Sequence, residues 1–284
     1  MIYKENPFVE VFTICVGVYA LLEKNADDEG YIWMYLIVGS EKSMLIDTGS
    51  GVGDLKKLCT RLSGSSELIV VNTHSHPDHA YGNCRFDSIY CHPRTFHELH
   101  IHNEHMWDKL FDNDGNGIWM NFTKDDLPTF KKYSMLACSD GTIFNLGDDL
   151  QIEVIETPGH HCGHICFLDR RHRLLFAGDS ICSDEIHVEG PWNRDPFSEY
   201  STIFAYLYGI NRLYFKKKEF DFIFPSHGNI KLKSDVINSL LQTCCGIIAT
   251  PEIFDRSEPA SNGQTRFFKK VEQLGTIVYR SVML

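Results

Sequence analysis

Four potential metal ligands are crowded into one short run of this chain. The run 73–79 reads Thr-His-Ser-His-Pro-Asp-His and contains His74, His76, Asp78 and His79. On a strand, the first two would share a face, and a tight turn after the proline can send the last two to a second point. Four such side chains are costly to leave unpaired, and a metal ion satisfies them. Any fold of this chain must therefore bring the run to a polar site.

Three further candidate ligands follow apolar, β-type segments in the same way. His160 comes after Thr-Pro-Gly, Asp179 after Ala-Gly, and His227 lies within Pro-Ser-His-Gly. Their repeated position after apolar segments favours a metal site assembled from loops at strand ends. Imidazole and carboxylate together suit zinc, and also iron or manganese.

Strands and helices alternate along both halves of the sequence, which predicts an α/β architecture. One buried strand is expected within residues 11–22. Further strands are predicted over residues 34–38, 43–47, 68–72, 88–91, 142–146, 150–156, 164–168, 173–176, 221–224 and 275–279, and helices over 54–62, 200–213 and 234–245.

The chain is long for one domain, but its composition marks no boundary. It has 284 residues, 43% of them hydrophobic, and no Pro/Gly/Ser-rich linker, low-complexity tract or abrupt charge shift. A single domain over 1–284 is therefore expected, with a helical or loop insertion at about 93–135. That insertion is either a lid over the active site or a surface segment packed on the fold.

The charge balance disfavours two classes of partner. A net charge of −11 repels phosphate backbones and anionic lipid, so we expect a small-molecule substrate and neither nucleic acid nor membrane. The apolar run 11–22 is too short to span a bilayer and follows Glu5 and Glu10, where a signal peptide would carry positive charge. A cytoplasmic protein with reduced cysteines is expected, because the ten cysteines form no CxxC pair.

Taken together, the motifs resemble those of the metallo-β-lactamase superfamily. Leu-Ile-Asp47-Thr-Gly, the HxHxDH run, Thr-Pro-Gly-His160, Gly-Asp179 and Ser-His227-Gly occur in that family's order, over about residues 35–228. The resemblance implies an αβ/βα four-layer sandwich of two mixed sheets flanked by helices, with a binuclear metal site.

Carried over to this sequence, the resemblance implies a role for each candidate. The first metal is held by His74, His76 and His160, and the second by Asp78, His79 and His227, with Asp179 bridging them. Asp47 is a supporting catalytic residue that accepts a hydrogen bond and fixes the site without binding metal. Asp78 is the candidate proton carrier. Two divalent ions are implied, with Zn²⁺ favoured and Fe or Mn also compatible.

Two positions separate subgroups of the family. His76 stands where oxygen-reducing diiron members have a carboxylate, and Asp179 stands where many true β-lactamases have Cys. The sequence is thus similar to the glyoxalase II, lactonase and thioesterase members, in which a two-metal-activated hydroxide attacks an ester, thioester or lactone. The alternatives are a small-molecule phosphodiesterase, an iron-dependent redox member such as a persulfide dioxygenase, and a metal-binding sensor without turnover.

Several histidines leave alternatives open. His161 and His164 compete with His160 as ligand; the Pro-Gly lead-in favours His160, with His161 exposed and His164 a supporting or core residue. His187, Trp192 and Tyr200 follow the bridging aspartate and are candidates for substrate binding.

A second group of histidines lies in the insertion, at His97, His100, His102 and His105. It predicts a solvated or pocket-lining helix, with a second metal site as the alternative. The oligomeric state is open, a homodimer being one possibility.

Overall fold

The computed structural model describes residues 1–24, 31–64, 67–118, 121–190, 196–260 and 263–280. The chain forms two compact units. The first comprises Met1–Cys138 and Phe144–Gln151, and the second comprises Ser139–Ile143 and Ile152–Leu284. The single-domain organisation stays a prediction, and each unit is described separately below.

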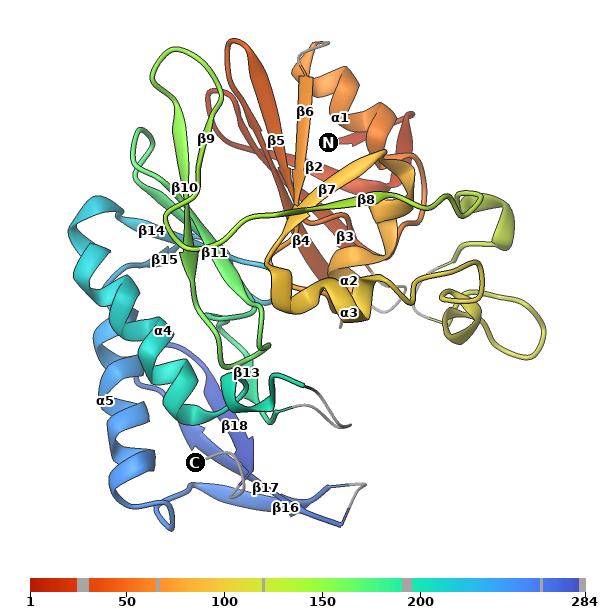
Figure 1. Cartoon of the computed structure of the whole chain (residues 1–284). Helices are drawn as coiled ribbons and strands as arrows, with labels where there is room; N and C mark the ends of the chain where they lie inside the picture. The colour runs from red at the N-terminus through yellow and green to blue at the C-terminus, as the bar shows by residue number, and fades with distance from the viewer. Residues whose placement is uncertain (25–30, 65–66, 119–120, 191–195, 261–262, 281–284) are drawn as a thin grey trace. The chain divides into compact units, whose positions relative to one another are not determined.

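The first unit is built on an eight-stranded mixed sheet whose strands lie in sequence order (Figure 1). Its strands are β1 (Ile2–Tyr3), β2 (Asn6–Cys15), β3 (Val18–Lys24), β4 (Tyr31–Val38), β5 (Lys42–Ile46), β6 (Glu67–Val71), β7 (Ser88–Cys91) and β8 (Ser134–Ala137). The strands up to β5 are antiparallel, and those from β5 to β8 are parallel. Because the carboxyl ends of parallel strands meet at one edge, the residues after β5 and β6 become neighbours.

Local signals explain the helices that connect these parallel strands. The helix α1 (Leu55–Ser63) begins where Asp54 accepts a hydrogen bond from the Lys57 backbone N–H at 3.0 Å, and it ends at Gly64, whose φ of 70° suits a glycine. The helix α2 (Pro77–Ala80) begins with proline, which has no N–H to leave unsatisfied. This short helix turns the chain directly after His76.

The second unit contains two sheets (Figure 1). The six-stranded mixed sheet has the order β15-β14-β12-β11-β10-β9, and a four-stranded sheet has the order β13-β18-β17-β16. The six strands are β9 (Ile143–Asn145), β10 (Gln151–Glu156), β11 (Ile165–Asp169), β12 (Leu174–Gly178), β14 (Phe222–Pro225) and β15 (Leu232–Lys233), and the four are β13 (Glu185–Val188), β16 (Arg256–Pro259), β17 (Thr265–Lys270) and β18 (Thr276–Arg280). Of these residues, Phe144, Asn145 and Gln151 are assigned to the first unit.

Two helices cover the core of the second unit. The helices α4 (Ile203–Lys216) and α5 (Val236–Ala249) lie side by side (Figure 1) and bury one face each. Their buried side chains, such as Tyr206, Ile210 and Leu240, pack with strand residues such as Leu175 and Ile223 in one hydrophobic cluster. The strands before Asp179 and His227, β12 and β14, run parallel and adjacent within this core.

The predicted elements are confirmed with several differences, and the short strands β1, β8 and β15 were not predicted. Residues 11–22 form a β2–β3 hairpin and not one strand, because Gly17, with φ of 78°, turns the chain. The four-stranded sheet was predicted only in its strand at 275–279. Within its described residues, 93–118 and 121–135, the segment 93–135 contains the short helices η2 (Pro93–Thr95), α3 (Phe96–Leu99), η3 (Asp108–Leu110) and η4 (Lys124–Asp126) before β8. Among the described residues, no helix is long and apolar enough to cross a membrane.

Candidate metal centre

The candidate ligands divide between the two units. His74, His76, Asp78 and His79 belong to the first unit, and His160, Asp179 and His227 to the second; all seven are of a kind and placement that can hold a metal ion.

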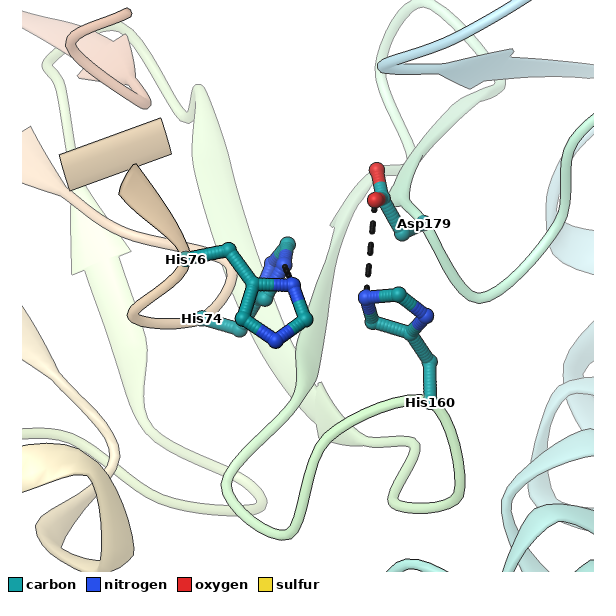
Figure 2. A group of neighbouring side chains, drawn as sticks. All are labelled: His74, His76, His160 and Asp179. Carbon is teal, nitrogen blue, oxygen red and sulfur yellow. Dashed lines mark hydrogen bonds and ion pairs between the residues drawn. The ribbon is translucent and has the colours of Figure 1, made fainter. Parts of the chain in front are cut away.

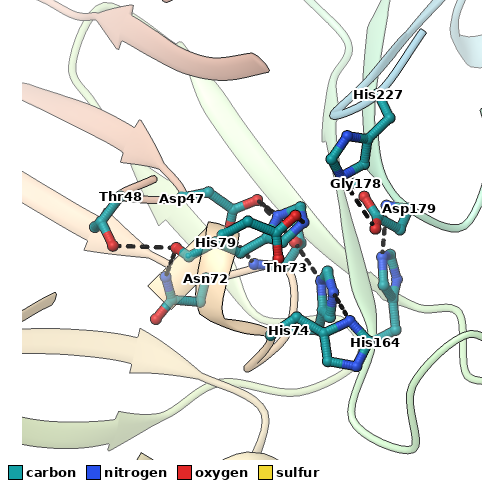
Figure 3. A network of polar contacts seen from close by, with 12 residues as sticks. Asp47, Thr48, Asn72, Thr73, His74, His79, His164, Gly178, Asp179 and His227 are labelled. Carbon is teal, nitrogen blue, oxygen red and sulfur yellow. Dashed lines mark hydrogen bonds and ion pairs between the residues drawn. The ribbon is translucent and has the colours of Figure 1, made fainter. Parts of the chain in front are cut away.

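In the first unit, Asp47 organises the strand ends. It follows β5, is fully buried, and its own N–H donates to the carbonyl of Val71 at the end of β6. Its carboxylate accepts hydrogen bonds from the Thr73 N–H and hydroxyl, both at 2.8 Å, and lies 3.0 Å from His79 Nδ1 (Figure 3). Because a carboxylate only accepts, the Nδ1–H of His79 is directed at Asp47, which turns its Nε2 toward Asp78. That is the arrangement of a metal-binding imidazole.

The other ligands of this unit lie beside His79. His74 Nε2 and His76 Nδ1 lie 2.9 Å apart (Figure 2), the spacing of a hydrogen-bonded pair. Asp78 Oδ2 lies 3.3 Å from His79 Nε2. The four candidate ligands of the run 73–79 therefore form two pairs, as the sequence predicts: His74 lies beside His76, and Asp78 lies beside His79.

A polar network that the sequence did not reveal fixes this turn. The carbonyl of His79 accepts hydrogen bonds from the Thr48 hydroxyl at 3.0 Å and the Asn72 amide at 3.1 Å (Figure 3). Asn83 in turn donates to Asn72 at 2.8 Å. Thr48 and Asn72 adjoin residues already singled out, and this adjacency is the only signal that would have indicated them.

The segment 93–135 also contacts the ligand run. Ser75, between His74 and His76, hydrogen bonds to Glu98 of α3. Trp107 is buried and donates its indole N–H to the Ser50 carbonyl at 2.9 Å, and it packs with Val52 and other buried side chains. This part of the segment is therefore packed against the loop after β5.

The histidine cluster of this segment does not form the predicted helix. The helix α3 ends at Leu99, and His100 and His105 are exposed. His102 is half-buried and contacts the Tyr133 hydroxyl at 3.0 Å; burial lowers its pKa to about 4, so it is neutral at pH 7. Among the described residues, these histidines do not appear in a group of three potential metal ligands.

In the second unit, Asp179 follows β12 and lies between two histidines. Its Oδ2 is 3.5 Å from His160 Nε2 and 3.5 Å from His227 Nε2 (Figures 2 and 3). His160 Nδ1 donates to the main-chain carbonyl of His187 at 2.9 Å, which turns its Nε2 toward Asp179. A carboxylate oxygen between two imidazole nitrogens is the arrangement expected of a bridging ligand.

Hydrogen bonding also separates His160 from its neighbours. His164 is buried; its Nε2 accepts the Asp179 N–H at 3.2 Å, so its Nδ1 carries the proton and contacts the Thr157 hydroxyl at 2.8 Å. This histidine supports Asp179, as predicted. The expectation that His161 is exposed is wrong: it is 5% exposed, and its Nδ1 accepts the Gly163 N–H in the turn.

A cavity of about 360 Å³ lies beside these ligands in the second unit. It is lined by His160, Asp179, Asp184, Glu185, His187 and His227. Of the predicted substrate-binding residues, His187 therefore faces the cavity. Tyr200 lies in η5 (Ser198–Tyr200) and is not among its lining residues, and Trp192 is outside the described residues.

An ion pair between the buried Glu189 and the half-buried Arg266 lies next to His187. Its Nδ1 contacts Glu189 Oε2 at 2.8 Å, and Glu189 also accepts hydrogen bonds from Arg266 at 2.6 and 3.0 Å. Burial raises the pKa of Glu189, but these bonds outweigh that effect and hold it below its usual value. Sequence reasoning missed Glu189 and Arg266, because neither lies near a ligand motif.

The donor set fits a divalent metal. Imidazole nitrogens with two carboxylates suit zinc, iron or manganese, and the hydrogen bonds at Asp47 and the His187 carbonyl orient the imidazoles as metal sites require. All ten cysteines are free thiols, and none belongs to these ligand groups.

Sequence comparison finds relatives that are described as thioesterases. Acyl-coenzyme A thioesterase MBLAC2 of Bos taurus is 26% identical over 200 residues, which cover 63% of this chain and 68% of that protein. An atrochrysone carboxyl ACP thioesterase of Aspergillus chevalieri is 24% identical over 150 residues, 52% of this chain and 39% of the relative.

The fold is shared with solved structures. A metallo-β-lactamase from Pontibacter korlensis is similar with a TM-score of 0.57 and 17% identity, covering 84% of this chain and 99% of that one. This likeness shows the predicted α/β sandwich fold of mixed sheets with flanking helices. The sequence profile of the metallo-β-lactamase superfamily matches residues 27–227, most of the chain and all seven candidate ligands. The chain therefore belongs to the metallo-β-lactamase superfamily.

Proposed function

We propose that this protein is a binuclear, zinc-dependent hydrolase of acyl thioesters, with esters and lactones as chemically related substrates. One ion would be held by His74, His76, His160 and Asp179, and the other by Asp78, His79, His227 and Asp179. One observation carries the proposal. His79 and His160 each donate Nδ1–H to a fixed acceptor, which supports Nε2 of both as the metal-binding atom.

The thioester is favoured among acyl substrates by the relatives. The similar proteins of Bos taurus and Aspergillus chevalieri are both described as thioesterases, of acyl-coenzyme A and of an acyl carrier protein. The cavity of about 360 Å³ beside Asp179 and His227 is large enough for part of a small acyl substrate. His187 would contact the substrate there, and Trp192 and Tyr200 stay candidates for more distant contacts.

Each residue has a task in this chemistry. Bound divalent ions lower the pKa of a coordinated water and polarise a carbonyl. Asp78 would accept the proton of the attacking water and deliver it to the sulfur, as the new C–O bond forms and the C–S bond breaks. Asp47 would keep His79 in its metal-binding tautomer, and His164 would hold the main chain of Asp179.

We further propose a cytoplasmic protein, since ten free cysteines suit a reducing compartment. The two units would act as one functional domain, because the proposed ligands come from both.

The test uses protein stripped of metal and then reloaded with zinc, iron or manganese. Its substrates are an acyl-coenzyme A, a lactone and a phosphodiester, compared with the variants His76→Ala and Asp179→Ala. We expect zinc to restore thioester hydrolysis in the wild type and in neither variant. Hydrolysis of the phosphodiester alone, oxygen consumption with one iron per chain, or metal binding without turnover would replace the proposal by the corresponding alternative.

A further inference from the structure

The main-chain carbonyl that orients His160 is carried by a different sheet. His160 lies in the loop between β10 and β11, and its Nδ1–H donates to the carbonyl of His187 on β13 at 2.9 Å. The geometry of this proposed ligand therefore depends on where β13 lies, and β13 belongs to the four-stranded sheet.

The strand β13 has few main-chain contacts of its own in that sheet. It is four residues long and is the edge strand, paired only with β18 in the sheet order, with His187 opposite Val278. A short edge strand is easily displaced unless side chains hold it.

Three arginines of the sheet provide that hold, and Arg256 of β16 contacts β13 itself by donating to Glu185 at 3.1 Å. Arg266 of β17 reaches past β18 and binds both oxygens of Glu189, at 2.6 and 3.0 Å. Arg280 of β18 is buried and donates to the carbonyl of Gly190 at 3.1 Å. A two-pronged arginine–carboxylate pair fixes direction as well as distance, so the chain directly after β13 is held at two points.

The same ion pair holds the side chain of His187. Glu189 is 6% exposed and lies 2.8 Å from His187 Nδ1, which fixes the ring at the wall of the cavity. Without Arg266, the buried carboxylate of Glu189 would lose its main charged partner, which is energetically costly. We expect β13 to move so that this carboxylate reaches water.

We propose that Arg266 and Glu189 are positioning residues for the metal ligand His160, acting through the His187 carbonyl. They would also position the His187 ring against the substrate. The four-stranded sheet is thereby a support of the metal centre, a role beyond the ligand set. The inference rests on the proposed metal site.

The experiment compares Arg266→Ala and Arg266→Lys with the wild type and with Lys269→Ala. Lys269 lies on the same strand and forms an ion pair with Asp255 at 3.0 Å, away from β13. The readouts are metal affinity by competition with a chromophoric chelator, and the visible absorption of Co²⁺-substituted protein. We expect Arg266→Ala to weaken metal binding about 10- to 100-fold and to change the Co²⁺ spectrum. Arg266→Lys should recover part of the loss, and Lys269→Ala should match the wild type.

A purely structural ion pair gives a different result. Arg266→Ala would then lower the thermal midpoint but leave metal affinity and the Co²⁺ spectrum unchanged, which would overturn the inference. If Arg266→Ala does not fold, Glu189→Gln is measured in its place, with the same expectation and the same contrary result. Failure of the proposed function is seen separately, as a wild-type protein that binds no metal.

Discussion

Asp47 supports the first unit's ligands by accepting three hydrogen bonds while fully buried. Its φ of 63° is in the left-handed region, which Asp tolerates better than most residues. In Asp47→Asn, an amide N–H₂ would face at least one donor and release His79 from its tautomer. We expect metal affinity to fall about 10- to 100-fold with the fold retained. Chelator competition measures this, and an Asn variant with wild-type affinity would show that Asp47 does not orient the site.

Glu23 on β3 is a buried carboxyl of the first unit outside the proposed mechanism. It hydrogen bonds to the Ser50 hydroxyl, and burial raises its pKa from 4.5 to about 7 despite that bond. Between these values the folded protein binds more protons at Glu23 than the unfolded chain. The free energy of unfolding therefore falls as pH rises from about 4.5 to about 7, by about 3 kcal/mol.

The Glu23→Gln side chain imitates the protonated carboxyl, so this variant should not show the decrease in the free energy of unfolding between about pH 4.5 and 7. Urea unfolding of metal-free protein at pH 5 and pH 7.5 measures it, with Glu67→Gln, an exposed carboxyl on β6, as the control. We expect Glu23→Gln to be the more stable protein at the higher pH only. Parallel pH profiles for wild type and Glu23→Gln would contradict the expectation.

At the scale of elements, the helix α4 packs closely on the loop before His160, and only glycine fits at position 159 of that loop. Gly159 has φ of 131°, and a Cβ there would lie 2.4 Å from the Cβ of Tyr206 on α4. Gly159→Ala must displace the loop, so we expect weaker metal binding together with a lower thermal midpoint. Gly246→Ala on α5 is the matched control, since nothing lies within 4 Å of its Cβ and alanine favours a helix by up to about 1 kcal/mol. Equal behaviour of the two variants would contradict this packing argument.

The strands that precede ligands could be predicted from sequence, because each is a short apolar run that ends at a polar motif. β6, β10, β12 and β14 are all of this kind, and β5 leads to Asp47 in the same way. The hairpin at residues 11–22 was missed because both strands are apolar and only Gly17 separates them.

β16 and β17 could not be recognised in the same way. Their charged residues are stabilised by ion pairs, within β16 between Arg256 and Glu258 and across strands between Glu258 and Arg266. For the same reason the ion pair between Glu189 and Arg266 could not be predicted from the sequence. The two residues are almost eighty positions apart, and only the fold brings them together.

At the scale of the whole molecule, the proposed ligands come from both units, so metal binding should stabilise the entire chain. A ligand that binds only the folded state adds about 3 kcal/mol when its free concentration is about 100 times Kd. We expect chelator treatment to lower the thermal midpoint, and zinc to restore it in the wild type but not in His227→Ala. An unchanged midpoint on complete metal removal would contradict a site shared by the two units.

The most direct test of the account is the metal content of purified, untagged protein, wild type beside Asp179→Ala. Elemental analysis should find about two divalent ions per wild-type chain. Asp179 Oδ2 lies 3.5 Å from both His160 Nε2 and His227 Nε2, and we propose that this carboxylate bridges the two ions. Asp179→Ala should retain its fold and lose most of this metal, together with thioester hydrolysis. A folded Asp179→Ala protein that is metal-free and fully active would contradict the account.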